Sequence, residues 1–396
     1  MGEINFFPDD YKIENQKTIL RLDLNVPIKD KLITDDTRIT SCIPFINSLI
    51  EKKAKIIIIS HLGRPKGIKV PELSLVPIYK YLKDKLKTNV YFFRGTFDEN
   101  TKEKFSYLKG GEVILIENIR YFKEETENDK VFSKKIAALG DIYINDAFSC
   151  SHRKQASIHN ITKFVKKSFA GPLFKQEIAA INLVIKNKKE PVTCIIGGSK
   201  ISTKINVITN LISKVNNLVI VGAMANNFFT YKKIKVGKSL IEKNTKKIIE
   251  DIYKKAEKSN CKILIPEDCK VGKNFDSEGE NKNLNEVLEN EIILDIGDNT
   301  IKKIEKKIDQ SNTVLWNGPA GYFENDNFAK GTLSIAEKIS KNTIEKSLIS
   351  VLGGGDTLAA VNKSKSKLSF SHLSTAGGAF LEYLEGKDLP GISVLK

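Results

Sequence analysis

The amino-acid sequence predicts an α/β protein with two doubly wound parallel-sheet domains of the Rossmann-like type, connected by a helix. Short apolar runs rich in β-branched residues recur along the chain, and each is followed by turn residues and a stretch of helical period. Continuous apolar strands that alternate with helices are typical of parallel sheets covered on both faces. With 396 residues the chain exceeds the usual size of one domain, so two hydrophobic cores are expected.

Each half of the chain contains about five predicted strands. In order they span 19–25, 56–60, 90–93, 113–116, 142–145, 192–196, 218–221, 263–265, 313–316 and 348–352. Between the halves, a Gly-Pro pair precedes an apolar-periodic segment, 173–185, which is predicted to be a connecting helix that ends in the polar segment 187–191. We therefore expect an N-terminal domain over 1–170, an interdomain helix within 171–187 and a second domain over 188–375.

Composition excludes several classes of protein. Apolar residues make up 41% of the chain and charged residues 28%, which argues against a disordered or fibrous protein. No apolar run approaches the roughly 20 residues of a membrane span, and the acidic N-terminus lacks a signal-peptide core. Five widely spaced cysteines suit a reducing cytoplasm and indicate no zinc site. The Lys-, Asn- and Glu-rich segment 276–290 is expected to be a solvated loop and helix.

The net charge of +16 favours either a polyanionic partner or a lysine-rich surface. Only six of the 64 basic residues are arginine, and none lies beyond Arg153. Because only arginine offers a planar fork for carboxylate or phosphate, each arginine is a candidate for anion recognition. A nucleic-acid-binding protein is the competing interpretation from another class, but the sequence lacks basic-aromatic interleaving and any helix-turn-helix signature.

Polar residues follow the predicted strands of the first half, where ligands of open parallel sheets bind. Asp23 and Asn25 follow the first strand, and Arg21, inside that strand, alternates with Asp23. Later loops, or segments shortly past them, carry basic and imidazole side chains, namely Arg38, His61, Arg64, Arg120, His152 and Arg153. The first half therefore indicates a basic site for a small anion.

Glycine-rich turns in the second half indicate nucleotide binding. Two segments, 196–204 and 352–357, end a strand and open a predicted helix, where backbone N–H groups can approach a phosphate. Lys200 and Lys204 are expected on one helical face, and Asp356 is a candidate Mg²⁺ ligand. Neither turn matches the P-loop or dinucleotide pattern. An anion site and a nucleotide site on one chain suggest phosphoryl transfer, and the absence of an evident general base suits a carboxylate acceptor.

Several motifs, in this order and spacing, resemble those of the phosphoglycerate kinase family over essentially the whole chain. They are RLDLNVP at 21–27, SHLGRP at 60–65, NDAF at 145–148, IGGSK at 196–200, WNGP at 316–319, GGGDT at 353–357, STAGGA at 374–379 and LPG at 389–391. The resemblance implies reversible phosphoryl transfer from 1,3-bisphosphoglycerate to Mg·ADP in glycolysis. It also implies a cytoplasmic monomer, a hinge that closes before in-line transfer, and a C-terminal segment, 376–396, that returns to the first domain.

The resemblance also assigns roles to single residues. The glycerate would be held by Asp23, Asn25, Arg38, His61, Arg64, Arg120 and Arg153. The nucleotide would be held by Lys204, Gly297, Asn317, Glu324, Gly354, Gly355, Asp356 and Thr357, with Mg²⁺ on Asp356. Arg38 and Lys200 would flank the transferred phosphoryl group.

Thr203, Gln155 and Ala376 depart from the commonest family pattern, and Cys150 stands where small residues are typical. None of these departures removes a charged group assigned to the chemistry. Another nucleotide-dependent acyl-phosphate or carboxylate kinase is the competing enzyme interpretation.

Overall fold

The computed structural model describes residues 3–396, which form two compact units. Unit 1 comprises the described residues up to Ile178 together with Asp388–Lys396, and unit 2 comprises Ala179–Lys387. Each unit contains its own six-stranded sheet in which every strand pair is parallel. The predicted α/β class with two parallel-sheet domains is therefore confirmed.

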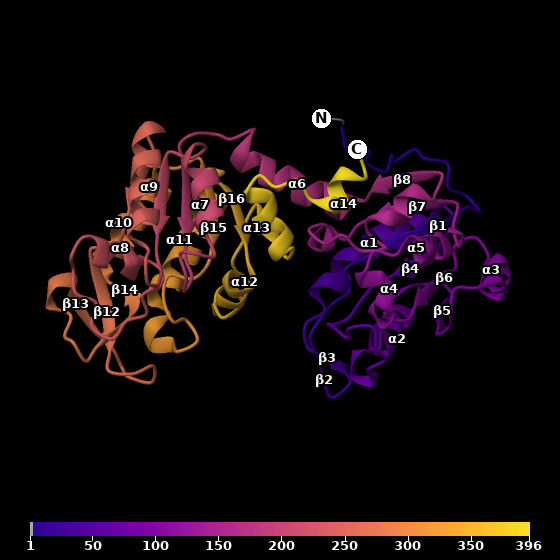
Figure 1. The fold of residues 1–396 in the computed structure, drawn as a ribbon, viewed down its shortest axis with the longest axis horizontal. Coiled ribbons are helices and arrows are strands. Elements are labelled where there is room, and N and C mark those ends of the chain that lie inside the picture. The colour runs from indigo at the N-terminus through magenta and orange to yellow at the C-terminus, as the bar shows by residue number, and fades with distance from the viewer. Residues whose placement is uncertain (1–2) are drawn as a thin grey trace. The chain divides into compact units, whose positions relative to one another are not determined.

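The sheet of unit 1 has the strand order β5-β6-β4-β1-β7-β8 (Figure 1). Its strands are β1 (Lys17–Arg21), β4 (Lys55–Ile59), β5 (Val90–Phe93), β6 (Val113–Ile116), β7 (Ile142–Asn145) and β8 (Lys167–Ala170). The central strand β1 pairs with β4 on one side and β7 on the other, so the carboxyl ends of these three strands lie together. Ligands of open parallel sheets bind beyond such ends.

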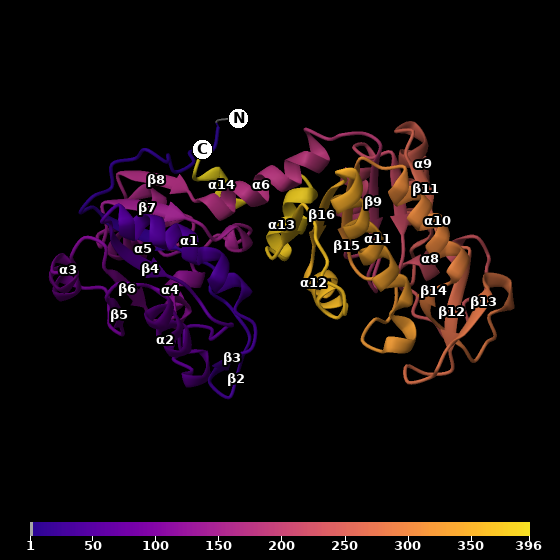
Figure 2. The same cartoon turned by 180° about the vertical axis from the view of Figure 1, so that it is seen from behind.

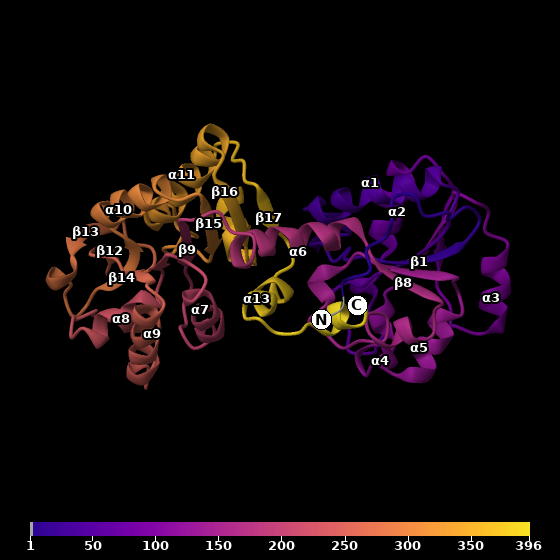
Figure 3. The ribbon, with the colours of Figure 1, turned by 90° about the horizontal axis from the view of Figure 1, so that it is seen from above.

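Alternate side chains of β4 enter two different cores. Ile56 and Ile58 pack with α1 (Thr37–Glu51) and α2 (Val76–Lys85), whereas Ile57 and Ile59 pack on the opposite face. That face is covered by α3 (Glu99–Ser106) and α5 (Lys130–Ala137), and Figure 3 shows the strands between the two helical layers. Unit 1 also contains the hairpin β2 (Ile28–Lys29) and β3 (Leu32–Ile33), the short helix α4 (Lys123–Thr126), and the 3₁₀ turns η1 (Pro71–Leu73), η2 (Ile119–Tyr121), η3 (Phe148–Cys150) and η4 (Asn160–Lys163).

A segment from the far end of the chain completes unit 1. The helix α14 (Pro390–Ser393) lies in this segment (Figure 2). The Gly391 N–H donates to the carbonyl of Ser151 at 2.9 Å, and Asn5 N–H donates to the carbonyl of Leu395 at 2.7 Å. Because Leu389, Ile392 and Leu395 are all buried, the segment is part of the core of unit 1.

Unit 2 repeats this layered design with the strand order β11-β10-β9-β15-β16-β17. Its strands are β9 (Val192–Ile196), β10 (Asn217–Ile220), β11 (Lys262–Leu264), β15 (Thr313–Asn317), β16 (Ile349–Gly353) and β17 (His372–Ser374). The helices α10 (Asp298–Asp309) and α11 (Lys330–Lys346) cover one face, and α7 (Ile205–Ile212), α8 (Ala225–Tyr231) and α9 (Lys246–Lys258) lie on the other (Figure 3). Two further helices, α12 (Gly355–Asn362) and α13 (Gly378–Leu384), and the turn η6 (Asp326–Phe328) complete the unit.

The predicted connecting helix is present as α6 (Pro172–Ile185). The carboxylate of Asp146, which follows β7, accepts a hydrogen bond from the Phe174 N–H at 2.9 Å. Asp146 therefore caps the first turn of α6 from a distant part of the chain, since the first N–H groups of a helix lack partners within it.

The structure corrects the prediction for 276–290. This segment contains the strand β13 (Glu280–Asn283) and the turn η5 (Leu284–Glu286), and β13 belongs to an antiparallel sheet with β12 (Asp268–Gly272) and β14 (Ile292–Ile296). Most side chains of β13 are exposed, so the strand lacks the apolar alternation that sequence patterns detect. No helix within residues 3–396 is both long and apolar enough to cross a membrane.

Candidate functional site

Asp23 is the centre of a polar cluster in unit 1, just beyond the carboxyl end of β1. The Arg38 Nη1 donates to Asp23 Oδ2 at 2.6 Å and to the Asn25 carbonyl at 3.2 Å. The Ser149 hydroxyl also donates to Asp23 Oδ2. Burial raises the pKa of Asp23, but the Arg38 charge and these hydrogen bonds outweigh it and hold the pKa below its usual range. Asp23 is therefore ionised and holds the Arg38 guanidinium in place.

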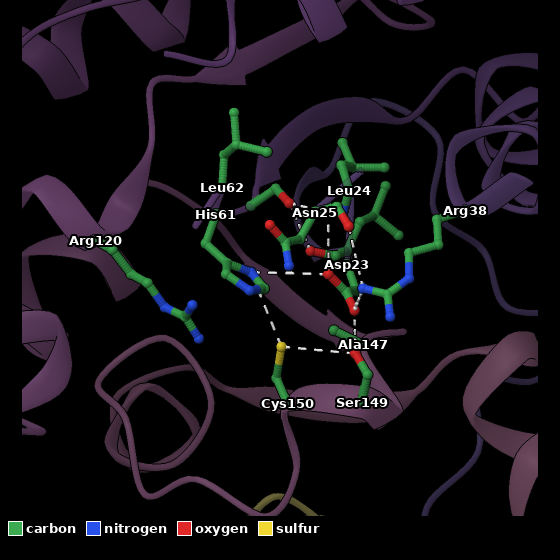
Figure 4. A network of polar contacts seen from close by, with 12 residues as sticks. Asp23, Leu24, Asn25, Arg38, His61, Leu62, Arg120, Ala147, Ser149 and Cys150 are labelled. Carbon is green, nitrogen blue, oxygen red and sulfur yellow. Dashed lines mark hydrogen bonds and ion pairs between the residues drawn. The ribbon is translucent and has the colours of Figure 1, made fainter. Parts of the chain in front are cut away.

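The loop after β4 is tied to the same cluster. The Asn25 side-chain oxygen accepts from the Gly63 N–H at 2.8 Å, and Asn118 donates to the carbonyl of Leu62 at 2.7 Å. These bonds hold the segment that carries His61, whose Nδ1 lies 3.9 Å from Asp23 Oδ1 (Figure 4). Burial lowers the pKa of His61 well below its usual value, so the ring is neutral.

Arg120 has a guanidinium edge that no described protein group satisfies. Its Nη1 donates to the Gly63 carbonyl at 2.8 Å, but Nε and Nη2 are buried and have no partner within residues 3–396. Burial lowers the pKa of Arg120 to about 10, which leaves it charged at neutral pH. A buried charged fork without a partner indicates that an anion binds there.

The structure brings together five of the seven predicted anion-site residues, namely Asp23, Asn25, Arg38, His61 and Arg120. Figure 4 shows them with Ser149 and Cys150. Arg153 lies near enough to lower the pKa of His61, and its Nε donates to His152 at 3.1 Å. Arg64 is exposed and forms no hydrogen bond or ion pair with another residue of 3–396, so the structure does not join it to the cluster. We call the seven residues the anion site.

Sequence reasoning did not assign Ser149 or Arg21 to the site. Ser149 carried no signal beyond its place in a loop, whereas Arg21 was marked by its alternation with Asp23. Asp23, His61 and Cys150 also place three ligand atoms within 4.8 Å of one another, a spacing compatible with a metal ion. Arg21 and Arg38 contact this group directly, so Coulomb repulsion disfavours a cation there.

Unit 2 contains a cavity of about 520 Å³ beside the carboxyl ends of its strands. Its lining combines the Gly-rich loops after β9 and β10 with apolar side chains from β14 and the loop after β15, including Gly198, Gly222, Ile293, Leu294, Pro319 and Phe323. A concave, mainly apolar site with a few polar groups is typical of a small-molecule ligand. We refer to this cavity as the nucleotide pocket, after the ligand that the sequence predicts for this unit.

Three glycines allow the loops at the pocket to approach backbone to backbone. A Cβ on Gly197 would lie 2.1 Å from the Pro319 carbonyl oxygen, and one on Gly318 would lie 2.3 Å from that of Gly197. Gly222 likewise contacts the backbone of the first loop, where a Cβ would lie 2.8 Å from Gly198 N. Any side chain at these positions would therefore separate the loops that form the pocket.

Lys204 and Asn317 begin a hydrogen-bonded chain beside the pocket. Lys204 Nζ donates to Asn317 Oδ1 at 2.5 Å, and Asn317 Nδ2 donates to the Gly353 carbonyl at 2.5 Å. Thr357 accepts from the Gly318 N–H at 2.7 Å. Gly354 has a φ of +106°, and a Cβ there would lie 2.6 Å from Asn317 Nδ2. Glycine is required here because it alone avoids both the strain and the collision.

The expectation that Lys200 and Lys204 share a helical face is wrong. The helix α7 begins only at Ile205, and Lys204 is its N-cap residue. Lys200 lies in the preceding loop, where its carbonyl accepts from the Thr203 hydroxyl at 2.8 Å. The glycine pair before Lys200 and this side-chain hydrogen bond favour turns over helix, so the helix starts later than its periodicity suggested.

Of the eight predicted nucleotide residues, two, Glu324 and Asp356, line the pocket, and the other six do not. Asp356 and Glu324 are exposed side chains of the pocket lining, and Asp356 lies in the first turn of α12 together with Gly355. Gly297 is the N-cap residue of α10 and adjoins Ile296, which lines the pocket, but Gly297 itself does not line it. An exposed carboxylate at a pocket mouth suits Mg²⁺ bound to nucleotide, which usually takes one or two carboxylates.

An anion site built from arginines and a pocket formed by glycine-rich loops are the features of a nucleotide-dependent phosphotransferase. A phosphoglycerate kinase family profile matches residues 8–387. A phosphoglycerate kinase of Wolbachia pipientis wMel is 43% identical over 386 residues, covering 97% of this chain and 96% of that protein. The phosphoglycerate kinase of Zymomonas mobilis is 40% identical over 97% of each protein.

Solved structures agree with these sequence relatives. The phosphoglycerate kinase of Coxiella burnetii superposes with a TM-score of 0.88 at 38% identity, covering 98% of this chain and 97% of that chain. The enzyme of Pyrococcus horikoshii superposes with a TM-score of 0.81 at 29% identity over 98% of both chains. The chain belongs to the phosphoglycerate kinase family. Its function is that of a glycolytic kinase with a carboxyl group as acceptor, and its substrates are 3-phosphoglycerate and ADP or ATP.

Proposed function

We propose that the anion site of unit 1 binds the glycerate substrate and that the nucleotide pocket of unit 2 binds Mg·ADP or Mg·ATP. The observation that carries this assignment is the buried Arg120 edge with two unsatisfied donors beside a neutral His61. Such an edge matches the oxygens of a phosphate or carboxylate. The pocket in unit 2 instead offers glycine backbone and an apolar wall, which suit a nucleoside with its phosphates.

Within the anion site we assign two kinds of contact. Asp23 accepts a hydrogen bond from the glycerate hydroxyl, and the Asn25 side-chain amide donates to the substrate, because both residues belong to the cluster. Four arginines neutralise the phosphate and carboxylate charges, namely Arg38, Arg64, Arg120 and Arg153, and the neutral His61 ring donates a hydrogen bond. Arg64 has a free guanidinium among the described residues and joins the site only when substrate is bound.

In unit 2, glycine backbone and lysine side chains at or beside the nucleotide pocket would contact the phosphates, whereas arginines do so in unit 1. The assigned residues are Lys204, Gly297, Asn317, Glu324, Gly354, Gly355, Asp356 and Thr357. The exposed Asp356 carboxylate at the pocket fits Mg²⁺, which when bound neutralises charge on the nucleotide phosphates. Asn317 orients Lys204, so the ammonium is held beside the first turn of α12.

Transfer needs no general base, because a carboxylate acceptor is already ionised at pH 7. We assign Arg38 and Lys200 to the transferred phosphoryl group, whose charge spreads over three equatorial oxygens in the transition state. Because the two residues belong to different units, in-line transfer follows a closure that excludes water, with α6 as the hinge helix. The protein acts as a cytoplasmic monomer in this scheme.

A coupled assay of ATP formation from ADP and 1,3-bisphosphoglycerate tests the activity, and no turnover by folded protein would contradict it. Calorimetric titration tests the site assignment separately for each substrate. Arg120→Met should weaken 3-phosphoglycerate binding by at least about tenfold and leave ADP binding unchanged, because a charged hydrogen bond contributes roughly 1.5–3 kcal/mol. Arg94→Met, which removes an exposed arginine of the same unit, is the matched control.

A further inference from the structure

Arg21 is a fully buried arginine that the proposed binding scheme does not use. It ends β1, where its Nη1 donates to the carbonyl of Leu22 at 2.5 Å. A buried guanidinium is retained only where its donors are satisfied. Its remaining nitrogens lie beside other groups: Nε contacts Ser157, and Nη2 lies 3.4 Å from His61 Nδ1 and 4.0 Å from the Cys150 sulfur.

The orientation of the Arg21 side chain is fixed by a directed chain of hydrogen bonds. Its Nε donates to the Ser157 hydroxyl at 2.9 Å, and that hydroxyl donates to Glu125 Oε1 at 2.6 Å. The Ser157 N–H donates to Glu125 Oε2 at 2.8 Å, and Glu125 is itself fully buried. The chain from Arg21 through Ser157 to Glu125 therefore fixes the orientation of the guanidinium and the position of Nη2.

That place is beside the His61 ring. Arg21 Nη2 lies 3.4 Å from His61 Nδ1, and a guanidinium can donate but cannot accept a hydrogen bond. Nδ1 must therefore be the unprotonated, accepting nitrogen, and the ring proton must lie on Nε2. The other neighbours of Nδ1 do not compete: Asp23 Oδ1 is 3.9 Å away, and the thiol of Cys150, also at 3.9 Å, is a weak partner.

We propose that Arg21, held by Ser157 and Glu125, is a positioning residue that fixes His61 as the neutral Nε2–H tautomer and so presents an N–H donor to the glycerate. The tautomer follows from the geometry of unit 1 alone, whereas its use in binding rests on the proposed function. Arg21, which does not contact the substrate, would thereby determine that His61, which does, offers a hydrogen-bond donor.

The charges around His61 agree with a neutral ring. Burial is the largest influence on its pKa and lowers it, and Arg21, Arg120 and Arg153 lower it further, while Asp23 alone raises it. Cys150, the remaining titratable neighbour, stays a neutral thiol because burial raises its pKa. A further positive charge on the His61 ring would be unfavourable beside these arginines, so the ring contributes a donor without adding charge.

Nitrogen NMR of the ¹⁵N-histidine-labelled full-length protein tests the tautomer directly. The chain has four histidines, and loss of one signal set in His61→Gln assigns this residue. In the wild type we expect Nδ1 to resonate as an unprotonated ring nitrogen and Nε2 as a protonated one, without change between pH 8 and pH 6. A protonated Nδ1 would overturn the proposal.

Two variants test whether Arg21 sets this state. Arg21→Lys keeps the charge opposite Glu125 but cannot reach Ser157 and His61 together, and Ser157→Ala removes the anchor while keeping both charges. Each should give a mixture of tautomers and raise the KM for 3-phosphoglycerate about three- to tenfold with the KM for ATP unchanged, the worth of one hydrogen bond. Arg94→Lys is the matched control and should change neither.

The outcomes separate the two proposals. A fully retained Nε2–H tautomer in both variants would overturn the role of Arg21, and Ser157→Ala decides alone if Arg21→Lys does not fold. A changed tautomer with an unchanged KM for 3-phosphoglycerate would support the role of Arg21 and would instead contradict the assignment of His61 to glycerate binding.

Discussion

The two units carry similar sheets, but the sites that we propose for phosphate groups are built by opposite means. In unit 1 the anion site consists of side chains, and buried hydrogen bonds to Asp23 and from Arg120 hold them in place. In unit 2 the loops at the pocket meet through glycine backbone, and the charged side chains Lys200 and Asp356 are exposed. Most of the first site is therefore held in place by hydrogen bonds within unit 1, whereas these charged side chains of the second are exposed to solvent.

This contrast has a physical cause. A small glycerate offers few atoms, so each must meet a pre-oriented group if the site is to discriminate. A nucleotide offers a large apolar surface as well as phosphates, so a cavity of about 520 Å³ with backbone donors suffices. Variants in the two units should therefore fail in different ways.

The largest effect is expected from Arg38→Lys in unit 1. The planar fork contacts Asp23 and, in the proposed mechanism, stabilises the transferred group. Its loss should therefore lower kcat about 10²–10³-fold and raise the KM for 3-phosphoglycerate far less. Steady-state kinetics of the coupled assay measure both constants, with Arg94→Lys as the control. A change in KM alone would make Arg38 a ground-state binder and would weaken the contrast between the units.

The second prediction concerns a feature that the units share. Each contains a buried aspartate that accepts from the N-terminal part of a helix and whose pKa burial raises to about 7, Asp146 for α6 and Asp295 for α11. The folded state thus holds these protons more tightly than the unfolded chain, whose carboxyl pKa is near 3.8. Their contribution to stability is full below about pH 4 and is lost as the pH rises to about 7.

Asp146→Asn and Asp295→Asn should each flatten this fall in the free energy of unfolding. The expected change between pH 4 and pH 7 is about 2–4 kcal/mol per site, since one pKa unit corresponds to about 1.4 kcal/mol. Urea unfolding of both variants and the wild type at several pH values measures it. An equally steep fall in either variant would show that its aspartate is ionised in the folded protein.

A third effect is expected from Asp356→Asn in unit 2. Loss of the carboxylate should raise the Mg²⁺ concentration needed for half-maximal activity about tenfold or more, because Mg²⁺ prefers anionic oxygen ligands. Folding should be unaffected, since the side chain is exposed. Mg²⁺ titrations at fixed ADP make the measurement, with Glu337→Gln, an exposed carboxylate of the same unit outside the pocket, as the control. An unchanged Mg²⁺ requirement would exclude Asp356 as the ligand.

The smallest effect is expected from Gly354→Ala, about tenfold on the KM for ADP. Its φ of +106° and the 2.6 Å approach to Asn317 Nδ2 would strain the loop by roughly 1–3 kcal/mol. Gly355→Ala is the comparison variant: the residue is also assigned to the nucleotide, but a Cβ there meets nothing within 4 Å and the backbone is kept. Kinetics with ADP and with 3-phosphoglycerate as varied substrates distinguish the two. An equal KM for ADP in the two variants would show that the backbone conformation at Gly354 does not determine nucleotide binding.

The fold was predictable where strands are apolar throughout. The run of isoleucines at 56–59 identifies β4, and turn residues after it locate the edge of the sheet. Edge strands were missed, because β8 begins with exposed Lys167, β17 contains only three residues, and β13 is largely exposed. Such strands are stabilised by backbone pairing with a neighbour, which leaves no pattern in their own residues.

The site was predictable to the extent that it follows strand ends. Asp23, Asn25 and His61 come directly after buried strands, so topology alone places them together. The role of Arg21 was not predictable, because its partners Ser157 and Glu125 are distant in sequence and only tertiary packing makes them neighbours. The helix expected at Lys200 was wrong because local turn bonds outweigh a four-residue spacing.

The segment that closes unit 1 also sets an order of events during translation. Ser151, which adjoins the anion site, receives its hydrogen bond from Gly391 only after the whole of unit 2 has been synthesised. At about 5–20 residues per second, the ribosome adds the intervening chain in roughly 10–50 s. Throughout that interval the nascent unit 1 lacks the apolar cover of Leu389, Ile392 and Leu395. Unit 1 therefore cannot complete its folding until the segment Asp388–Lys396 has left the ribosome.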